Sequence, residues 1–286
     1  MLRKAVFPVA GLGTRMLPAT KVVPKEMLPV VDRPLIQYAF EEARAAGIEQ
    51  FIFVTGRGKA DIEDHFDRAY ELDAVLTRKG KTAELAAMAG WLPAAGELSY
   101  TRQPEALGLG HAVWCARHLV GDEPFAVILV DDLILGSTPC LRQMVDAFAE
   151  TRGNLVAVEE VPQDQTDRYG VLDPMSDDGR LVAIKGLVEK PHPAEAPSRL
   201  AVIGRYILLP EVFEHLSLQQ KGAGGEIQLT DAMARMIGRA PFHGLRFAGR
   251  RFDCGGKLGY LEAMIACALE RDELRDGVRE MLRRYR

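Results

Sequence analysis

Residues 4–30 read KAVFPVAGLGTRMLPATKVVPKEMLPV, and the order of features in this stretch favours one class of fold. A short apolar run at residues 4–9 leads directly into a loop with glycine at positions 11 and 13. The apolar run predicts a strand. Two glycines directly after a strand let backbone N–H groups close on a phosphate, because no Cβ blocks the approach. The stretch therefore predicts a first strand followed by a phosphate-binding loop.

The rest of the chain extends this pattern into an α/β fold. Strands are expected at residues 50–55, 97–102 and 125–130, and helices at 61–66, 82–89, 110–119 and 141–151. A further helix is expected between Pro34 and Gly47, where apolar residues recur at helical spacing. Such alternation is typical of a mostly parallel sheet with helices on both faces. From residue 154 strands follow one another, at 155–161, 181–188 and 200–209. We therefore predict a Rossmann-like mixed, mostly parallel sheet flanked by helices, with extra antiparallel strands in the second half.

Composition excludes several classes of protein. Of the 286 residues, 48% are hydrophobic and 27% are charged, which rules out a disordered chain, a collagen-like chain and a disulfide scaffold. The formal net charge of −4 gives no reason to expect a nucleic acid or an anionic membrane as partner. Cysteines at 115, 140, 254 and 267 show no CxxC spacing. We expect free thiols and a cytoplasmic location.

The loop after the first strand also carries positive charge. Its cations are Arg15, Lys21 and Lys25, and prolines stand at positions 18, 24 and 29. Prolines stiffen a loop and reduce the freedom of its unfolded state, which suits charges that must stay in place. We expect the loop to bind phosphate, rather than to be a surface loop with solvated cations.

Other chemistries fit the residues less well. A dinucleotide fingerprint would need glycine at position 16 and an acid at the end of the second strand, where the chain has Met16 and Thr55. The run 80–82, GKT, resembles the end of a Walker A loop, but position 75 is valine. No GxSxG elbow is present, and the six histidines show no HExxH spacing. Nicotinamide-dependent and hydrolytic activities therefore lose support.

Two acids, Asp131 and Asp132, follow the expected strand at 125–130. Ligands of open α/β sheets lie beyond the carboxyl ends of strands, so these carboxylates are expected to point into a crevice. Mg²⁺ takes one or two carboxylates together with phosphate oxygens. The residues alone leave open which acid would bind a metal and which caps a turn.

Residues 11–30 resemble the signature of the sugar-1-phosphate nucleotidyltransferases, GxGTRxxPxTxxxPKxxLPV. Further motifs of that family follow in order: GLGHA at 108–112, YGV at 169–171, VEKP at 188–191 and GEIQLTD at 225–231. The resemblance covers nearly the whole chain and is far more specific than a single glycine loop.

The resemblance implies transfer of a uridylyl group from UTP to glucose 1-phosphate, giving UDP-glucose and pyrophosphate. A dTTP- or CTP-dependent enzyme is the alternative within the family. A nucleotide-sugar dehydrogenase and a non-catalytic sugar-nucleotide sensor are the alternatives from other classes. The resemblance also implies Mg²⁺ as cofactor and a homo-oligomer, dimer or tetramer, with neither nucleic acid nor membrane as partner.

The family pattern also assigns roles to individual residues. It implies that Arg15 and Lys25 are catalytic, and that Asp131 binds the metal with Asp253 as a possible second ligand. The implied nucleotide-binding residues are Ala10, Gly11, Gly13, Thr14, Glu26, Gln103 and Gly108. The implied sugar-phosphate-binding residues are Gly170, Glu189 and Lys190.

We expect one domain of 286 residues with three parts. Residues 1–153 would bind the nucleotide, residues 154–256 would bind the sugar phosphate, and residues 257–286 would form a C-terminal helical segment. This segment carries an apolar stripe of Leu258, Leu261, Ile265, Ala268 and Leu269. We expect the stripe to pack on the body of the protein, with a subunit contact as the alternative.

Overall fold

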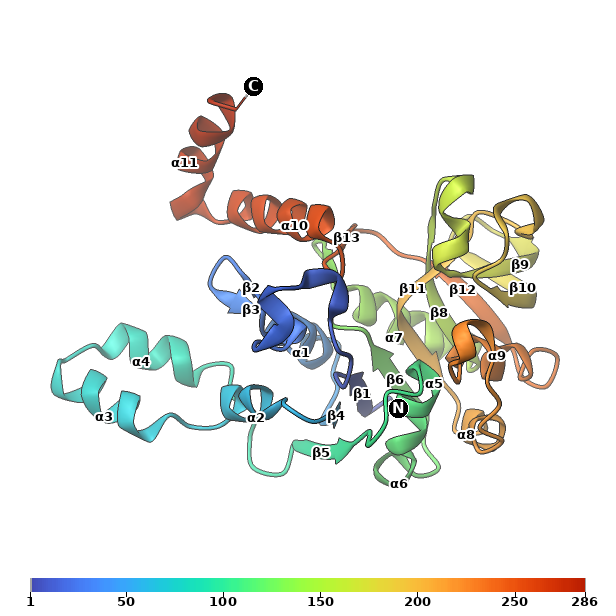
Figure 1. Cartoon of the computed structure of the whole chain (residues 1–286), viewed down its shortest axis with the longest axis horizontal. Helices are drawn as coiled ribbons and strands as arrows, with labels where there is room; N and C mark the ends of the chain where they lie inside the picture. The colour runs from blue at the N-terminus through green and yellow to red at the C-terminus, as the bar shows by residue number, and fades with distance from the viewer. Residues whose placement is uncertain (1, 286) are drawn as a thin grey trace.

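The computed structural model describes residues 2–285. A nine-stranded sheet lies at its centre, in the order β5-β4-β1-β6-β11-β8-β12-β10-β9 (Figure 1). Its strands in chain order are β1 (Lys4–Pro8), β4 (Gln50–Thr55), β5 (Leu98–Arg102), β6 (Phe125–Ile128), β8 (Asn154–Glu160), β9 (Gly170–Asp177), β10 (Leu181–Glu189), β11 (Leu200–Leu208) and β12 (Phe242–Arg246). The predicted α/β class is confirmed.

Strand direction changes between the two halves of the chain. β1 runs parallel to β4 and β6, and β4 runs parallel to β5. β11 is antiparallel to both β6 and β8, and β10 is antiparallel to β9 and β12. One pair in the second half, β8 and β12, is parallel. The long connection from residue 161 to 241 allows β12 to return beside β8 in the same direction.

Helices cover the sheet and extend beyond it. They are α1 (Leu35–Ala45), α2 (Ala60–Phe66), α3 (Tyr70–Arg78), α4 (Thr82–Ala89), α5 (Leu109–Cys115), α6 (Arg117–Val120), α7 (Cys140–Thr151), α8 (Val212–Leu216), α9 (Leu229–Ala234), α10 (Lys257–Glu270) and α11 (Asp272–Arg283). The single helix expected at 110–119 is divided at Ala116, whose backbone stays in the helical region, so the departure is small.

Two small antiparallel pairs lie outside the main sheet. β2 (Pro29–Val30) pairs with β3 (Arg33–Pro34), and β7 (Asp132–Leu135) pairs with β13 (Arg250–Asp253). In the second pair Asp253 lies opposite Asp132. Residues that are far apart in the sequence are thus brought to the end of β6.

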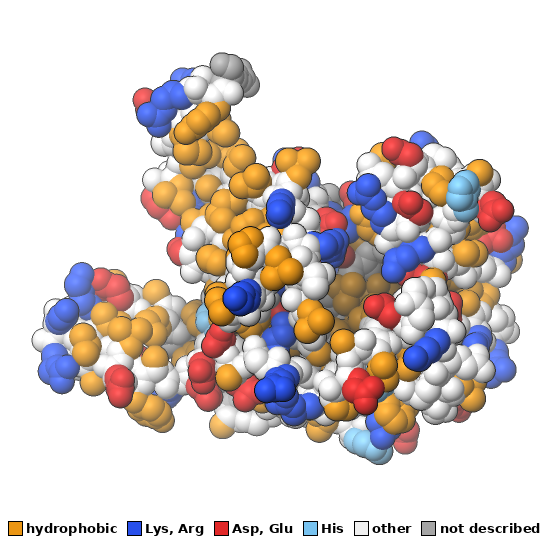
Figure 2. All heavy atoms as spheres, in the orientation of Figure 1, with side chains coloured by type: hydrophobic (Ala, Val, Ile, Leu, Met, Phe, Trp, Pro, Cys, Tyr) orange, Lys and Arg blue, Asp and Glu red, His pale blue; other side chains and the backbone are white. Residues whose placement is uncertain are grey.

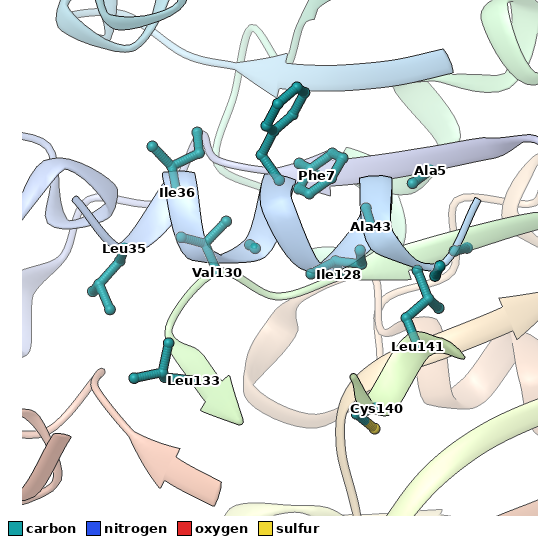
Figure 3. Close-up of a cluster of buried hydrophobic side chains, with 14 of the residues drawn as sticks. Ala5, Phe7, Leu35, Ile36, Ala43, Ile128, Val130, Leu133, Cys140 and Leu141 are labelled. Carbon is teal, nitrogen blue, oxygen red and sulfur yellow. The ribbon is translucent and has the colours of Figure 1, made fainter. Parts of the chain in front are cut away.

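The hydrophobic core has one part on each face of the sheet. Successive side chains of β1 and β4 alternate between two buried clusters, as expected for strands. In the first cluster Phe7 of β1 and Ile128 of β6 lie beside Ile36 and Ala43 of α1 (Figure 3). Burial of this helix face fixes β1 and β6 relative to each other, and both strands lead into the site described below.

Two helical arms project from the body (Figure 1). One is α3 with α4 and the other is α10 with α11, and hydrophobic side chains gather on both (Figure 2). The expectation that the α10 stripe packs on the body is wrong for Leu258 and Leu261, which are 72% and 57% exposed. The residues that α10 buries are Ala263, Cys267 and Ala268. Among residues 2–285, no helix combines the length and the apolar character that crossing a membrane requires.

Candidate active site

Two adjoining cavities open where β1 and β6 end. Because these strands are parallel neighbours, the segments that follow them emerge at one edge of the sheet. The glycine-loop cavity has a volume of about 570 Å³ and is lined in part by Ala10, Gly11, Gly13, Thr14, Lys25, Gln103 and Gly108. The β10 cavity has a volume of about 630 Å³ and is lined in part by Gly170, Glu189, Lys190 and Asp253. Arg15 and Asp131 line both, and each cavity has the size of a small-molecule site.

The glycine loop folds tightly over Lys25. Gly13 has a φ of 64°, and a Cβ there would lie 3.0 Å from the Cβ of Lys25. The hydroxyl of Thr20 donates to the carbonyl oxygen of Gly13 at 2.7 Å. Glycine is required at this position both for the left-handed backbone and for the close approach.

Two cations converge on the carboxylate of Asp131. Lys25 Nζ lies 2.8 Å from Asp131 Oδ2, and Arg15 Nη2 lies 3.7 Å from the same oxygen. Burial is the largest single effect on Asp131 and acts to raise its pKa, but the charge and hydrogen bond of Lys25, a backbone hydrogen bond and the charge of Arg15 together outweigh it, so the pKa is lowered. Burial likewise acts to lower the pKa of Lys25, but the charges of Asp131 and Glu26 and the hydrogen bond to Asp131 together raise it. The Lys25–Asp131 pair is therefore ionised. The side chain of Arg15 is 64% exposed and lines both cavities.

The neighbouring acid, Asp132, lies in a different environment. Its Oδ2 accepts a hydrogen bond from the backbone N–H of Gly204 at 2.9 Å, and its Oδ1 accepts one from Arg251 Nε at 2.5 Å. These bonds hold Asp132 between β11 and β13. Of the two acids, Asp131, to which the family pattern assigns the metal, is the one beside the cations.

Asp253 completes a small group of carboxylates around Arg15. Arg15 Nη1 lies 3.9 Å from Asp253 Oδ2. A Cβ at Gly255 would collide with the Arg15 guanidinium and lie 2.9 Å from Asp131 Oδ2, so this glycine keeps the space between the acids open. Residues 2–285 contain no group of three or more His, Cys, Asp or Glu side chains that could hold a metal by itself. Two carboxylates with room for phosphate oxygens fit Mg²⁺, which is a hard cation.

The β10 cavity is built around the end of a hairpin. Gly170 of β9 pairs with Glu189 of β10, and a Cβ on Gly170 would lie 3.3 Å from Glu189 Oε2. Lys190 Nζ lies 3.4 Å from Glu189 Oε1, and the Lys190 backbone N–H donates to the carbonyl oxygen of Tyr169. The hairpin thus presents an acid and a base side by side at the cavity wall.

Glu26 lies beneath the glycine loop, lines neither cavity, and is 1% exposed. Lys59 Nζ donates to Glu26 Oε2 at 2.7 Å and to the carbonyl oxygen of Gly11 at 2.8 Å. Sequence reasoning missed Lys59. The signal was a second glycine-bearing loop, TGRGK at 55–59, directly after another parallel strand.

Arg205 is a second residue that sequence reasoning missed. It is 1% exposed, and its guanidinium forms a buried ion pair with Glu42 at 2.7 Å. It also donates to the carbonyl oxygens of Leu129 and Asp132, on either side of the Asp131 segment. An arginine inside the apolar run LAVIGRYIL at 200–208 was the signal, because a buried cation needs a partner.

Comparisons with known proteins agree with this geometry. The family model described as nucleotidyl transferase matches residues 4–267. A protein of Komagataeibacter xylinus named UTP–glucose-1-phosphate uridylyltransferase is 54% identical over 90% of each chain. A UTP-bound UGPase from Acinetobacter baumannii is 43% identical over 99% of each chain, with a TM-score of 0.92. A UDP-glucose pyrophosphorylase complexed with UDP-glucose is 44% identical over 95% of this chain and 100% of that chain, with a TM-score of 0.85.

The family match spans both cavities and all the motifs that line them. The resemblance inferred from the glycine loop and the later motifs is thereby confirmed, and the chain belongs to the nucleotidyl transferase family.

Proposed function

We propose that this protein transfers the uridylyl group of UTP to α-D-glucose 1-phosphate, giving UDP-glucose and pyrophosphate. One observation carries the proposal: two small-molecule cavities meet at Arg15 and Asp131, so that two phosphorylated substrates can face each other there. The names of the relatives, which include UTP- and UDP-glucose-bound structures, support this choice of substrates.

The reaction needs charge compensation more than proton transfer. An oxygen of the sugar phosphate attacks the α-phosphorus of UTP, and the bond from that phosphorus to the pyrophosphate oxygen breaks. A phosphate monoester has a second pKa of about 6, so the attacking oxygen is already ionised near neutral pH. Two unit charges about 4 Å apart repel by about 4 kcal/mol at an effective dielectric constant of 20. Positioned cations are therefore the main catalytic groups.

Three side chains supply this positive charge in the proposal. Arg15 and Lys25 bind the UTP phosphates and the charge that develops on the departing pyrophosphate, and Lys190 binds the incoming sugar phosphate. Asp131, with Asp253, would hold Mg²⁺ at the junction of the cavities. When bound, this ion neutralises phosphate oxygens as a Lewis acid.

The remaining residues bind and orient the substrates. Backbone N–H groups of the loop from Ala10 to Thr14, Gly11 and Gly13 included, close on the nucleotide, and Gln103 and Gly108 contact the base. Glu26 contributes through Lys59 and the carbonyl of Gly11, since it does not reach the cavity. Gly170 leaves room for Glu189, whose carboxylate accepts hydrogen bonds from sugar hydroxyls.

The proposal extends to the organisation of the whole chain. Residues 1–153 would be the nucleotide-binding half of one domain, residues 154–256 the sugar-phosphate half and residues 257–286 an appended helical segment, with residues 1 and 286 outside the part that the structure describes. We further propose a cytoplasmic homo-oligomer of two or four copies that binds neither nucleic acid nor membrane.

A substrate panel tests the proposed function directly. Pyrophosphate release is measured for the purified protein with Mg²⁺, four nucleoside triphosphates and several sugar phosphates. We expect the highest kcat/KM with UTP and glucose 1-phosphate. A preference for dTTP or CTP, a nicotinamide absorbance change with UDP-glucose, or tight UTP binding without turnover would each replace the proposal by a different one.

A further inference from the structure

Gln103 makes two hydrogen bonds at the wall of the glycine-loop cavity. Its side-chain nitrogen, Nε2, lies 3.1 Å from the carbonyl oxygen of Gly108 and 3.1 Å from Nδ1 of His111. A carbonyl oxygen only accepts, so the amide atom that faces Gly108 must be the nitrogen. In this structure the amide of Gln103 therefore places Nε2 against Gly108 and His111.

His111 takes the second N–H of this amide. Its Nδ1 must carry a lone pair, so the ring is neutral with its hydrogen on Nε2. The residue is 7% exposed, stacks on Trp114 with 6.2 Å between ring centroids, and places Nε2 3.9 Å from Sγ of Cys115. Burial lowers the pKa of His111, against the charge and a backbone hydrogen bond of Glu105, which both act to raise it. This agrees with a neutral ring at neutral pH.

With both N–H groups engaged, the amide oxygen Oε1 is the atom of Gln103 left to the cavity. No described residue donates a hydrogen bond to it, and it is not among the buried polar atoms that lack a partner. An amide oxygen accepts and cannot donate. Uracil and thymine present an N–H at ring position 3, whereas cytosine presents a lone pair there.

We propose that His111 is a positioning residue that makes this site accept uracil or thymine and reject cytosine. By holding Nε2 of Gln103, it leaves Oε1 to accept a hydrogen bond from N3–H of the base. A cytosine base would set its N3 lone pair against Oε1, and sites built on one such hydrogen bond discriminate strongly. The inference rests on the proposed function, because it assumes a pyrimidine nucleotide in this cavity.

Gly108 cannot hold this orientation by itself. Its carbonyl is fixed, because Gly110 N–H donates to Ile227 O at 2.8 Å and Ile227 N–H donates to Leu107 O at 2.7 Å. However, it accepts only one of the two hydrogens of the Gln103 amide. Without His111 the other N–H would be buried without a partner, which weakens the preference for this orientation although Gly108 still accepts one hydrogen. Whenever the amide rotates, a cytosine N3 finds a donor.

Two variants test whether the hydrogen-bond acceptor at His111, rather than the imidazole ring itself, holds the Gln103 amide. His111→Leu removes the acceptor, whereas His111→Asn places a carboxamide oxygen where Nδ1 lay. We measure kcat/KM for UTP, dTTP and CTP with glucose 1-phosphate. His111→Leu is expected to lower the UTP to CTP ratio by about tenfold to a hundredfold, the range of one unmade buried hydrogen bond. His111→Asn is expected to restore the ratio to within about threefold of wild type.

Two controls distinguish a change in base specificity from a general loss of folding or of catalytic activity. His118→Leu changes an exposed histidine on the adjacent helix and is expected to keep the wild-type ratio. The ratio of UTP to dTTP is expected to stay constant in every variant, because both bases carry N3–H. An equal loss with all three nucleotides, or an unchanged UTP to CTP ratio in His111→Leu, would overturn the inference. A wild-type protein that does not use UTP would instead overturn the proposed function.

A measurement on the unaltered protein does not depend on any variant being active. Nitrogen-15 spectra of histidine-labelled wild-type protein report the tautomer of each ring, and the signals of His111 are those missing in His111→Asn. We expect the Nε2–H tautomer at pH 7.5. A ring with its hydrogen on Nδ1, or a doubly protonated ring, could not accept from Gln103 and would refute the proposed role.

Discussion

Arg15 is the most exposed of the three cations in the site, lines both cavities and lies within 4 Å of two carboxylates. Arg15→Ala is expected to lower kcat by about 10³-fold, by analogy with cations that meet transition-state charge in other phosphoryl transfers. Because the side chain is 64% exposed, the melting temperature is expected to stay unchanged.

The matched control is Lys21→Ala, which removes an exposed cation from the same loop. Turnover by pyrophosphate release and melting by calorimetry are measured on both variants. Near wild-type turnover in Arg15→Ala, or an equal loss in Lys21→Ala, would show that Arg15 has no special place in the reaction.

Substitution of Asp131 is expected to reduce activity, whereas substitution of Asp132 is expected to reduce stability. Asp131→Asn keeps the shape of the side chain but loses the charge that would hold a hard cation, so most Mg²⁺-dependent turnover should disappear, with partial rescue by excess metal. Asp132→Asn loses the ion pair with Arg251 and should lower the melting temperature. A Mg²⁺ titration of activity, with melting curves for both, makes the comparison. Full activity in Asp131→Asn beside a stable but inactive Asp132→Asn would reverse the assignment.

At the scale of elements, α2 and the base of the α3–α4 arm are joined by a histidine. His65 stacks on Trp91 with 4.6 Å between ring centroids, and its Nε2 is buried without a hydrogen-bond partner among the described residues. Burial lowers the pKa of His65 to about 4, from an ordinary value of about 6.5. Above pH 6.5 the ring is neutral in both the folded and unfolded states, and its contribution to stability is fully present. Between pH 6.5 and pH 4 only the unfolded state takes up the proton, so stability falls as the pH falls.

His65→Phe keeps a stacked ring and removes this titration. The melting temperature is measured from pH 7.5 to pH 4 for both proteins, so that carboxylates common to both cancel in the difference. We expect the wild-type protein to lose more stability than His65→Phe over this range. Parallel curves would mean that His65 is already exposed to solvent or charged in the folded protein.

The elements that the sequence predicted are those with a regular local pattern. The apolar residues of α1 recur at helical spacing, and β4 is predicted at its observed bounds, Gln50–Thr55. β9 was missed because Pro174 and two acids interrupt its apolar alternation. β12 was missed because it is short and contains Gly244. That glycine is required by packing, since a Cβ there would lie 2.6 Å from the side chain of Leu172.

The residues of the candidate site likewise fall into those that a local motif predicts and those that depend on distant contacts. A contiguous motif identified the glycine loop, and the structure brings residues 10–15 and Lys25 to one cavity with Gln103 and Gly108, whereas Glu26 of the same motif lines neither cavity. Lys59, Arg205 and His111 act through contacts with segments distant in the sequence or through the amide of a neighbour. No local pattern encodes such pairings, because a lysine, an arginine or a histidine on its own is compatible with many partners.

At the scale of the whole molecule, the two cavities draw on different parts of one sheet. Glu189 and Lys190 belong to β10 and the residue after it, on the far side of β11 from the glycine loop. Glu189→Gln is expected to raise the apparent KM for glucose 1-phosphate severalfold and leave UTP binding unchanged. Lys190→Ala should do the same and also lower kcat, because like-charged phosphates then approach without compensation.

Two titrations on each variant make this comparison, with UTP alone by calorimetry and glucose 1-phosphate by steady-state kinetics. Arg180→Ala, which removes an exposed ion pair on the same hairpin, serves as the control and should behave as wild type. Weakened UTP binding with an unchanged response to glucose 1-phosphate would show that the two half-sites are assigned the wrong way round.

The bond from Lys59 to the carbonyl of Gly11 has a consequence for the rate at which nucleotide associates. Lys59 follows β4 and Gly11 follows β1, and Glu26 accepts a hydrogen bond from the same ammonium, so Lys59 and Glu26 together hold the glycine loop while Gly11 still lines the cavity. A loop ordered during folding loses little further entropy when a ligand arrives. Nucleotide capture should therefore proceed in a single kinetic phase whose rate rises linearly with concentration, without the plateau that a slow closing step would impose.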